Sequence, residues 1–372
     1  MDNNYDFIII GAGISGCSVA YQLSQKNLNL NILLVDKKND VAQGASGAAG
    51  AFLSPLLGKP NDFKDLVTNS LKYSTTLYKE NFSKYIDNCG TTRIPKTKQE
   101  QEKFQDYIPF MDFEYKKDKD KDGYFFDIGT VVKSYDICKN MIKDDSVQTK
   151  FDYKVKKLNY DGKYWILNDE LKTKNIILTT GAKMELLDEF YINIRAVWGR
   201  RIDVITSTKV DYNYHKACSV SKSIKIENDK YLVSIGATHH REKIDVDDID
   251  SNIDELFIKA NDIINLKDTK VVNQYVGARA CSIDYFPIVA DIIDSKKTLE
   301  EFPYLKNGTN VDSSRFIRYK NFYILNGVGG RGFVLAPYLA KQLVDNIIDK
   351  KPVDNNIKVD RLFKKEVRRI KI

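Results

Sequence analysis

The chain has 372 residues, of which 42% are hydrophobic and 29% charged, a composition that is ordinary for a folded globular protein and long enough for two domains. No apolar run approaches the ~20 residues that span a bilayer, and the first residues lack the features of a signal peptide, so we expect a cytoplasmic protein without a membrane partner. Five scattered cysteines and three histidines argue against a disulfide framework and a metal site, and a net charge of +7 is by itself weak evidence for a polyanionic partner.

The first predicted elements form a βαβ unit. Residues 5–10 are almost all apolar, which is typical of a strand buried on both faces of a parallel sheet. A glycine-rich turn follows, then a helix through 16–26 and a strand at 31–35 that ends on Asp36. This order predicts the first half of a dinucleotide-binding domain.

The turn itself matches the pattern GxGxxG through Gly11, Gly13 and Gly16. Its glycines permit a tight turn, close approach of the backbone to a pyrophosphate, and close packing of helix on strand. The helix N-terminus, at Ile14 and Ser15, then offers free N–H groups to the phosphates. Such a pattern predicts a dinucleotide without separating FAD from NAD.

The segment after the second strand favours FAD. Asp36 lies 20 residues beyond Gly16, where it is placed to bond a ribose hydroxyl, and Lys37 follows it. A run of small residues comes next and lets backbone lie against a flat, extended cofactor. We expect cofactor contacts from Ala45, Ser46, Gly47, Gly50 and Ala51.

The middle of the chain predicts a change from helix to strand. Residues 59–118 look mostly helical and end in a charged run at 116–122 that we expect to be an exposed loop. Further on we expect a strand at 124–132, a helix at 134–143, strands at 154–158, 164–167 and 175–179, a β-rich region at 195–320 with a helix near 251–264, a strand at 322–325 and a helix at 334–349.

Strands that run into glycine turns lie at both ends of the chain and near 175–182, so the nucleotide domain is expected to be discontinuous. We therefore predict an α/β fold (α+β overall), with a Rossmann-like FAD-binding domain and an inserted, mainly antiparallel-sheet substrate domain. The expected division is 1–82, 129–194 and 322–350 for FAD binding, 83–128 and 195–321 for the substrate domain, and 351–372 for a basic tail.

Three motifs together resemble the D-amino-acid-oxidase superfamily. The segment Gly44–Leu57 is similar to its flavin loop, and Val276–Ala280 with Asp284 and Pro287 is similar to its "GxRA…D…P" segment. The turn Gly327–Gly332, followed by Ala336 and Pro337, resembles the closing motif of one branch, the oxidase domains of bifunctional tRNA-modifying proteins.

The resemblance implies a two-domain enzyme with non-covalent FAD and an antiparallel sheet covering the flavin. It implies oxidation of the secondary amine of 5-carboxymethylaminomethyl(-2-thio)uridine at the tRNA wobble position, with release of glyoxylate. The methyltransferase half of those proteins is missing from these residues, so a separate methyltransferase is expected to act on the product. Molecular oxygen is the expected electron acceptor.

Oxidation next to a carboxylate needs orientation more than acid–base groups, because the cofactor supplies the reactivity. Arginine clamps a carboxylate bidentately, and only 12 of the 58 basic residues are arginine. The resemblance makes Arg279 the expected substrate clamp, with a structural salt bridge as its alternative role. Arg331 is expected near flavin or substrate, or else bracing its loop. Further cofactor contacts are expected from Gly181 and, in and just after the closing turn, from Gly327, Gly329, Gly330, Arg331, Gly332 and Phe333.

Three further residues have weaker functional readings. Cys281 lies near the position where some amine oxidases of the superfamily attach flavin, although this branch is not expected to do so. His239 and His240 end a predicted strand, where they could line the pocket or help oxygen activation, or could be exposed loop residues.

The C-terminal tail alternates basic and apolar residues at helical spacing. One interpretation is a docked helix with a solvated basic face. The other is a tRNA-binding tail, in which Lys364, Lys365, Arg368 and Arg369 contact phosphates. The alternatives for the whole chain are an oxidase of glycine, sarcosine or a D-amino acid, and a non-catalytic flavin-binding subunit.

Overall fold

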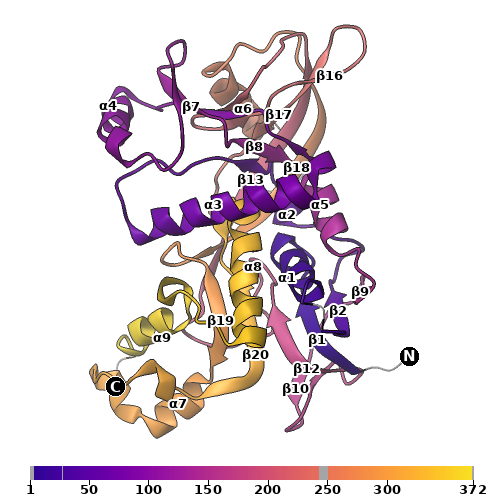
Figure 1. Cartoon of the computed structure of the whole chain (residues 1–372), viewed down its shortest axis with the longest axis vertical. Helices are drawn as coiled ribbons and strands as arrows, with labels where there is room; N and C mark the ends of the chain where they lie inside the picture. The colour runs from indigo at the N-terminus through magenta and orange to yellow at the C-terminus, as the bar shows by residue number, and fades with distance from the viewer. Residues whose placement is uncertain (1–3, 27, 243–249, 371–372) are drawn as a thin grey trace.

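The structure is a computed structural model that describes residues 4–26, 28–242 and 250–370, so residues 1–3 and 371–372 at the ends of the expected domains lie outside it. Figure 1 shows two sheets stacked along the long axis of the molecule, with the long helix α3 (Asp62–Asn81) lying across the middle.

The first sheet has a parallel centre. Strands β1 (Asn4–Ile10), β2 (Ile32–Val35), β9 (Val147–Lys150), β12 (Leu171–Leu178) and β20 (Arg318–Asn326) run parallel, with β1 between β2 and β12. The hairpin β10 (Leu158–Tyr160) and β11 (Trp165–Leu167) pairs with the start of β12, and β19 (Ile288–Ile293) pairs antiparallel with β20.

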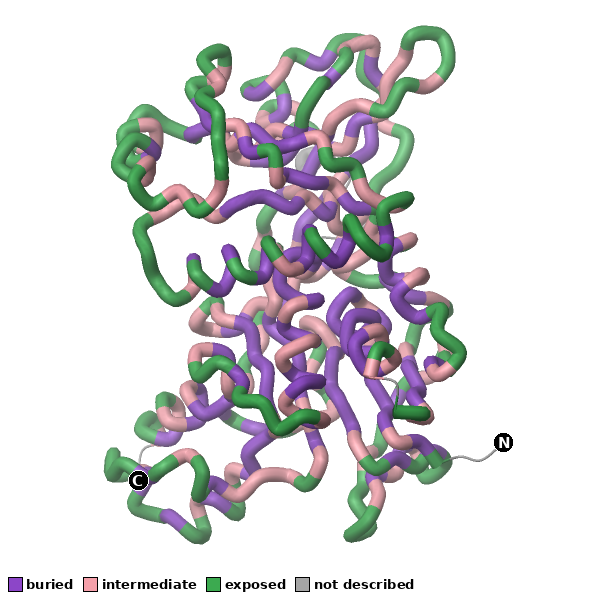
Figure 2. Tube along the Cα trace, in the orientation of Figure 1, coloured by how far each residue is buried: buried purple, intermediate pink, exposed green. Residues whose placement is uncertain are grey.

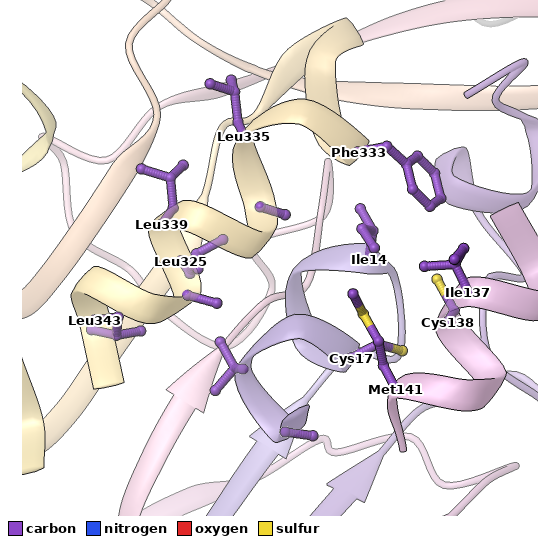
Figure 3. Packing of buried hydrophobic residues seen from close by; sticks show 14 of the residues in the cluster. Ile14, Cys17, Ile137, Cys138, Met141, Leu325, Phe333, Leu335, Leu339 and Leu343 are labelled. Carbon is purple, nitrogen blue, oxygen red and sulfur yellow. The ribbon is translucent and has the colours of Figure 1, made fainter. Parts of the chain in front are cut away.

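Both faces of this sheet are covered, which explains why β1 is apolar throughout. Phe7 and Ile9 face a core shared with the helices α1 (Ile14–Ser24), α5 (Ser134–Met141) and α8 (Gly332–Asp349). Ile8 and Ile10 point to the opposite side, into a core that includes the terminal helix α9 (Asp360–Val367). Figure 3 shows the first core at the contact of α1, α5 and α8, and Figure 2 shows that buried residues run along these strands.

Helix α8 contains Pro337, whose missing N–H leaves the carbonyl of Phe333 without its partner in the helix. The hydroxyl of Tyr78 on α3 donates to that carbonyl at 2.9 Å, and Ser74 donates to the next carbonyl, of Val334, at 2.7 Å. The carbonyl that the proline leaves without a partner is therefore satisfied by a hydroxyl group of the crossing helix.

The second sheet has nine strands and is mainly antiparallel, with one parallel pair, β5 with β14. Helix α6 (Asp250–Asn261) covers one of its faces through Leu256 and Ala260, which pack with Ile202, Val204 and Ile235. Its strands are β5 (Thr91–Arg93), β6 (Lys116–Asp118), β7 (Gly123–Phe126), β13 (Ile194–Thr206), β14 (Asn213–His215), β15 (Ser219–Val220), β16 (Ile224–Lys225), β17 (Tyr231–Gly236) and β18 (Lys270–Ser282).

Short elements join the two sheets. A three-stranded sheet is formed by β3 (Phe52–Leu53), β8 (Thr130–Val132) and β4 (Ile86–Asp87). The remaining helices are α2 (Ala45–Ala48), α4 (Lys98–Asp106) and α7 (Ser295–Glu301). No helix of the described residues is long and apolar enough to cross a membrane.

The predicted mixed α/β fold with an inserted antiparallel sheet is confirmed, whereas several local details differ. Residues 288–321, expected in the substrate domain, include β19, which pairs with β20 in the first sheet. The segment 59–118 contains two helices but also β4 and β5, and 116–118 is a strand rather than a loop. These short strands are defined by pairing with distant segments, so local periodicity does not reveal them.

Candidate active site

Four chain regions meet where the parallel strands end. β1 runs into Gly11, β2 into Asp36, β12 into Thr179–Gly181, and β20 into Asn326–Gly327. Because the carboxyl ends of parallel strands lie at one edge of a sheet, turns separated by up to about 300 residues in sequence come together. The Asn326 side chain, for example, donates to the carbonyl of Gly181 at 2.9 Å.

The first turn is built for close packing and for an exposed helix N-terminus. Gly11 has a φ of +113°, and a Cβ on Gly16 would lie 1.8 Å from the carbonyl oxygen of Gly11, so α1 begins directly against the end of β1. No side chain caps α1 at Gly13, and its first turn carries no acidic residue. The free N–H groups and the helix dipole make this end favourable for a phosphate.

Asp36 is held beside this turn. Its carboxylate accepts the N–H of Ala12 at 2.7 Å and the N–H of Lys38 at 2.8 Å, while Lys37 is exposed. A carboxylate has lone pairs beyond those two, so Asp36 keeps acceptor capacity for a hydroxyl group.

The small residues of α2 lie between the two sheets. The Ser46 hydroxyl accepts the N–H of Ile14 at 2.9 Å, which ties α2 to the start of α1. A Cβ on Gly277 of β18 would lie 2.9 Å from Cα of Ala45 and 2.8 Å from Cβ of Ala48. The backbone of α2 therefore packs directly on the second sheet.

These residues fit FAD. A Cβ added at Gly181, just beyond β12, would meet nothing within 4 Å, so this glycine borders open space at the edge where the strands end. The N-terminus of α1, where Ser46 takes one N–H but no acid opposes the helix dipole, suits the pyrophosphate. Asp36 suits the ribose, and the small residues of α2 leave room for a flat ring system.

The face of the second sheet opposite α6 points toward α2 and is rich in cations. The register aligns Arg93, His215, Ser219, Gly236, Arg201 and Tyr275 in one row across six strands, so their side chains share a face. Arg201 donates to the carbonyl of Ala49 at 2.6 Å and lies 3.9 Å from the centre of the Tyr275 ring. The apolar neighbours Ile202 and Ile235 point to the other face, under α6.

Arg279 lies on the same face, four residues beyond Tyr275. Its guanidinium rests on Gly199, because a Cβ there would lie 2.5 Å from Nη1 and 2.6 Å from Nη2. Nη1 donates to the carbonyls of Thr238 at 3.1 Å and Trp198 at 3.4 Å. Burial lowers the pKa of Arg279, and within the described residues no carboxylate forms an ion pair with it. The salt-bridge alternative considered for Arg279 is therefore not what the structure contains.

Arg331 lies close to Arg279 through the turn that carries it, because a Cβ on Gly330 would lie 3.5 Å from Cδ of Arg279. It donates to the carbonyl of Ser54 at 3.2 Å, so loop bracing is part of its role. Burial lowers its pKa to about 10, and in the described part of the chain it too has no acidic partner.

Arg93, Arg201 and His215 were missed by the sequence analysis. Arg93 donates to the Ser54 hydroxyl at 3.3 Å and to the carbonyl of Pro55 at 3.0 Å, beside Arg331. Burial, followed by the charge of Arg331, lowers its pKa to about 9. The scarcity of arginine, which drew attention to Arg279, was a usable signal for Arg93 and Arg201 as well.

Burial and the positive charge of the arginines lower the pKa of His215 and of His239. Burial, then Arg93 and Arg331, holds the pKa of His215 well below its ordinary value, and its Nδ1 lies 2.7 Å from the hydroxyl of Ser219. His239 is an exposed residue, yet desolvation by the surrounding protein and then the charge of Arg279 lower its pKa to about 4. His240 lies with its Nε2 3.4 Å from a carboxylate oxygen of Glu255, away from the arginines.

A family model described as FAD dependent oxidoreductase matches residues 6–346, which include the whole of this site. The chain belongs to that family. The flavoenzyme assignment predicted from the sequence, with FAD as cofactor, is thereby confirmed.

Curated relatives of this FAD dependent oxidoreductase include a tRNA 5-methylaminomethyl-2-thiouridine biosynthesis bifunctional protein MnmC from Legionella pneumophila (strain Corby), 24% identical over 370 residues, and one from Campylobacter fetus, 22% identical over 369 residues. The matches cover 92% and 93% of this chain but only 54% and 56% of the relatives. The chain thus spans about half the length of the curated relatives it matches.

Solved structures show the same fold. Glycine oxidase from Bacillus cereus superposes with a TM-score of 0.74 at 16% identity, and iminodiacetate oxidase from Chelativorans sp. BNC1 with a TM-score of 0.69 at 17% identity. Each comparison covers 94% of this chain and 96% of the other.

The structure also shows what surrounds Cys281 and the C-terminal tail. Cys281 lies near Gly329 in the closing turn. Burial raises the pKa of its thiol, so the thiol is mostly protonated at neutral pH.

The tail forms α9, which docks through buried Leu362, Phe363 and Val367. Of its four predicted phosphate ligands, Lys365, Arg368 and Arg369 are exposed, Lys364 is half-buried over the ring of Phe316, and Arg369 pairs with Glu366 at 2.9 Å.

Proposed function

We propose that this protein oxidises the secondary amine of 5-carboxymethylaminomethyl(-2-thio)uridine at the wobble position of tRNA. The observation that carries the proposal is the match to tRNA-modifying relatives, which runs through 92% of the chain and therefore includes both sheets and every arginine of the site. The resemblance of the closing turn, Gly327–Gly332, points in the same direction.

FAD, when bound, would accept a hydride from the carbon that lies between the amine and the carboxylate. The substrate is left as an imine, and water adds to it and releases glyoxylate, so that the tRNA keeps an aminomethyl group. The net change is a two-electron oxidation of one C–N bond followed by its hydrolysis, with molecular oxygen as the proposed final acceptor.

The protein's part in this reaction is to hold the two reactants. Arg279 would bind the carboxylate of the carboxymethyl group, because its guanidinium is fixed on Gly199 and has a fork of donors that no acid among the described residues occupies. Arg331 would contribute positive charge at the same place. The three predicted binding groups for FAD would be the turn at Gly11–Gly16, Asp36 and the small residues of α2.

Methylation of the aminomethyl product would need a group-transfer activity outside these residues. The relatives are described as bifunctional, and this chain covers about half of their length. We therefore propose that a methyltransferase activity, on whatever chain it lies, completes the modification.

The test is nucleoside analysis of tRNA that carries the carboxymethylaminomethyl group, before and after incubation with the FAD-loaded protein in air. We expect loss of that nucleoside, appearance of the aminomethyl nucleoside and one glyoxylate for each group removed. Arg279→Gln should lower the rate by about 100-fold, since a charge-assisted fork is lost, while the protein stays flavin-bound.

Glycine and sarcosine are assayed alongside the tRNA, because a small-molecule amine oxidase would share every residue of the FAD site. Turnover of the free amines without turnover of tRNA would contradict the proposal. A flavin that is not reduced by any of these substrates in the absence of oxygen would favour the non-catalytic alternative.

A further inference from the structure

Of the arginine pair Arg93–Arg331, Arg93 has no part in the reaction described above and Arg331 only adds positive charge near the carboxylate, although the pair lies beside the substrate clamp. Both guanidinium groups bond to Ser54, one through the hydroxyl at 3.3 Å and the other through the carbonyl at 3.2 Å. Two cations that share one small residue are close neighbours. The charge of Arg331 accordingly depresses the pKa of Arg93.

The hydrogen bonds of this pair use only part of its capacity. Nη1 of Arg93 donates to Ser54 and Pro55, and among the described residues its buried Nε has no hydrogen-bond partner. In the described residues neither arginine has a carboxylate within ion-pair distance. Placing two cations together without an acid is unfavourable unless an anion joins them.

One acid, Glu100, exerts its charge on Arg93, but in the described part of the chain it forms no ion pair with it, and the other charges that act on this place are positive. His215 is the neighbour of Arg93 in the row across the sheet, and it is kept neutral by burial and by both arginines. Lys96, three residues beyond Arg93 and exposed, adds a further charge that acts on His215 and on His239. Because His215 is neutral, it does not balance the charge of the two arginines, and an anion can bind to one or both of them.

The pair lies apart from the Arg279 guanidinium, although the closing turn that carries Arg331 touches the Arg279 side chain. Arg331 follows Gly330, which lies against Cδ of Arg279, while Arg93 comes from β5, on the far side of His215 from β18. The site thus presents two positively charged places, one on β18 and one between β5 and the closing turn.

We infer that Arg93 and Arg331 form a second anion subsite, which binds an oxyanion carried by the substrate in addition to the carboxylate held by Arg279. The inference rests on the proposed function in one respect: in a tRNA substrate the second oxyanion is a phosphate of the modified nucleotide. A second carboxylate in a small dicarboxylic amine has the same chemistry and is the other possible source.

The first experiment compares the 5-carboxymethylaminomethyluridine nucleoside with its 5′-monophosphate, using anaerobic flavin reduction of the FAD-loaded protein. We expect kcat/KM to be at least about 10-fold higher for the monophosphate, since each charge-assisted hydrogen bond contributes about a factor of ten. Inorganic phosphate should compete with the monophosphate and not with the nucleoside. Equal kcat/KM values together with no competition would overturn the subsite.

The second experiment measures how this preference depends on Arg93. In Arg93→Gln the preference for the monophosphate should fall to about 1, and in Arg93→Lys it should be partly recovered. Arg315→Gln is the matched control, because Arg315 is exposed and contacts Phe302 far from this row, and it should keep the preference. Equal losses for nucleoside and monophosphate in Arg93→Gln would assign Arg93 a structural role and contradict the inference. If Arg93→Gln does not fold, the phosphate competition in the unaltered protein decides.

A third arm separates this inference from the proposed function. Iminodiacetate and sarcosine differ by one carboxylate, so they test the second subsite without any nucleotide. If no nucleoside, nucleotide or tRNA reacts, the proposed function fails; a preference for iminodiacetate that Arg93→Gln removes would then support the subsite with a carboxylate as its ligand. If iminodiacetate and sarcosine also react alike, the subsite is refuted independently.

Discussion

Gly199 shows how a single residue on one strand sets the position of a functional group on another. The Arg279 guanidinium lies over Gly199 because no side chain is there, and its Nη1 bonds to carbonyls of Trp198 and Thr238 fix its orientation. The position is a matter of space and not of backbone strain, because Gly199 lies within the regular strand β13.

Gly199→Ala should therefore lower activity without removing FAD. The added Cβ would come within 2.5 Å of Nη1, so the guanidinium must move, and a displaced binding group costs about 100-fold in rate. Anaerobic flavin reduction by substrate measures this loss, and the visible spectrum of the bound flavin reports retention of the cofactor. Gly58→Ala is the matched control, since a Cβ there meets nothing within 4 Å; a similar loss in both variants would contradict the explanation.

Among the elements, α3 crosses α8 and donates a hydrogen bond to a carbonyl that α8 cannot pair within its own backbone. Pro337 donates nothing to the carbonyl of Phe333, and the fully buried Tyr78 hydroxyl supplies the missing bond. Burial raises the pKa of Tyr78 well above its ordinary value, so the hydroxyl stays protonated and remains a donor.

Tyr78→Phe is expected to lower the free energy of unfolding by about 1–3 kcal/mol, because a buried carbonyl is left without a donor while the ring still fills its space. Urea unfolding of the FAD-bound protein measures the change. Tyr135→Phe, at an exposed tyrosine, should change stability much less. An unchanged unfolding midpoint for Tyr78→Phe would show that the carbonyl is satisfied in another way.

Helices α1 and α8 are also joined electrostatically, by Lys26 and Asp345. Burial would raise the pKa of Asp345, but hydrogen bonds from Lys26 and Lys341 outweigh it and lower the pKa to about 2. A carboxyl group whose folded pKa is depressed stabilises the fold above its unfolded pKa, near 4, and loses that contribution as the pH falls toward its folded pKa.

Asp345→Asn should consequently cost about 2 kcal/mol of stability at pH 7. The deficit relative to the unaltered protein should shrink as the pH falls from about 4 toward 2, because the aspartate is then protonated too. Urea unfolding at a series of pH values from 7 to 3 measures it, with Asp349→Asn, at a more exposed partner of Lys26, as the milder comparison. A deficit that stays constant to pH 3 would rule out the ion-pair explanation.

At the scale of the whole molecule, the net charge of +7 becomes informative through its distribution. One group of cations lies between the two sheets, and another lies on α9, which Figure 1 places beside β19 and α7, at the opposite end of the molecule from the second sheet. Arg361 takes no part in the second group, because it is committed to an ion pair with Asp284 at 2.8 Å.

If the tail contacts tRNA phosphates, replacing Lys364, Lys365, Arg368 and Arg369 by glutamine should flatten the salt dependence of tRNA binding. Each lost contact lowers the magnitude of the slope of log K against log salt concentration by about 0.7–0.9. Because Arg369 already pairs with Glu366, we count three contacts and expect a total change of about 2 to 2.7. The apolar face of α9 is untouched, so thermal stability should stay the same.

Filter-binding titrations at several salt concentrations measure this slope. The control is a variant with the same number of charges removed from exposed lysines near the β10–β12 hairpin, namely Lys156, Lys157, Lys163 and Lys172. An equal slope for the tail variant and the unaltered protein would leave α9 with a docking role alone.

The first dinucleotide-binding unit could be predicted from the sequence, because each of its parts is local. A buried strand, a glycine turn, a helix and an acid 20 residues beyond Gly16 lie within 36 residues, and the small-residue segment follows at once. The residues expected to bind the pyrophosphate and the ribose are therefore close together in the sequence. The resemblance to the family added Arg279 and the closing turn to the predicted site.

The tertiary structure alone decided which cations share the site. Arg93, Arg201, His215 and Arg279 come from four strands, and only the register of the second sheet, with its parallel β5–β14 pair, aligns them on one face. It also decided that β19 joins the first sheet and that Arg279 and Arg331 lie without an acid among the described residues. Pairing between segments far apart in the chain is selected by the burial of whole faces, and that information is not present in any local stretch of sequence.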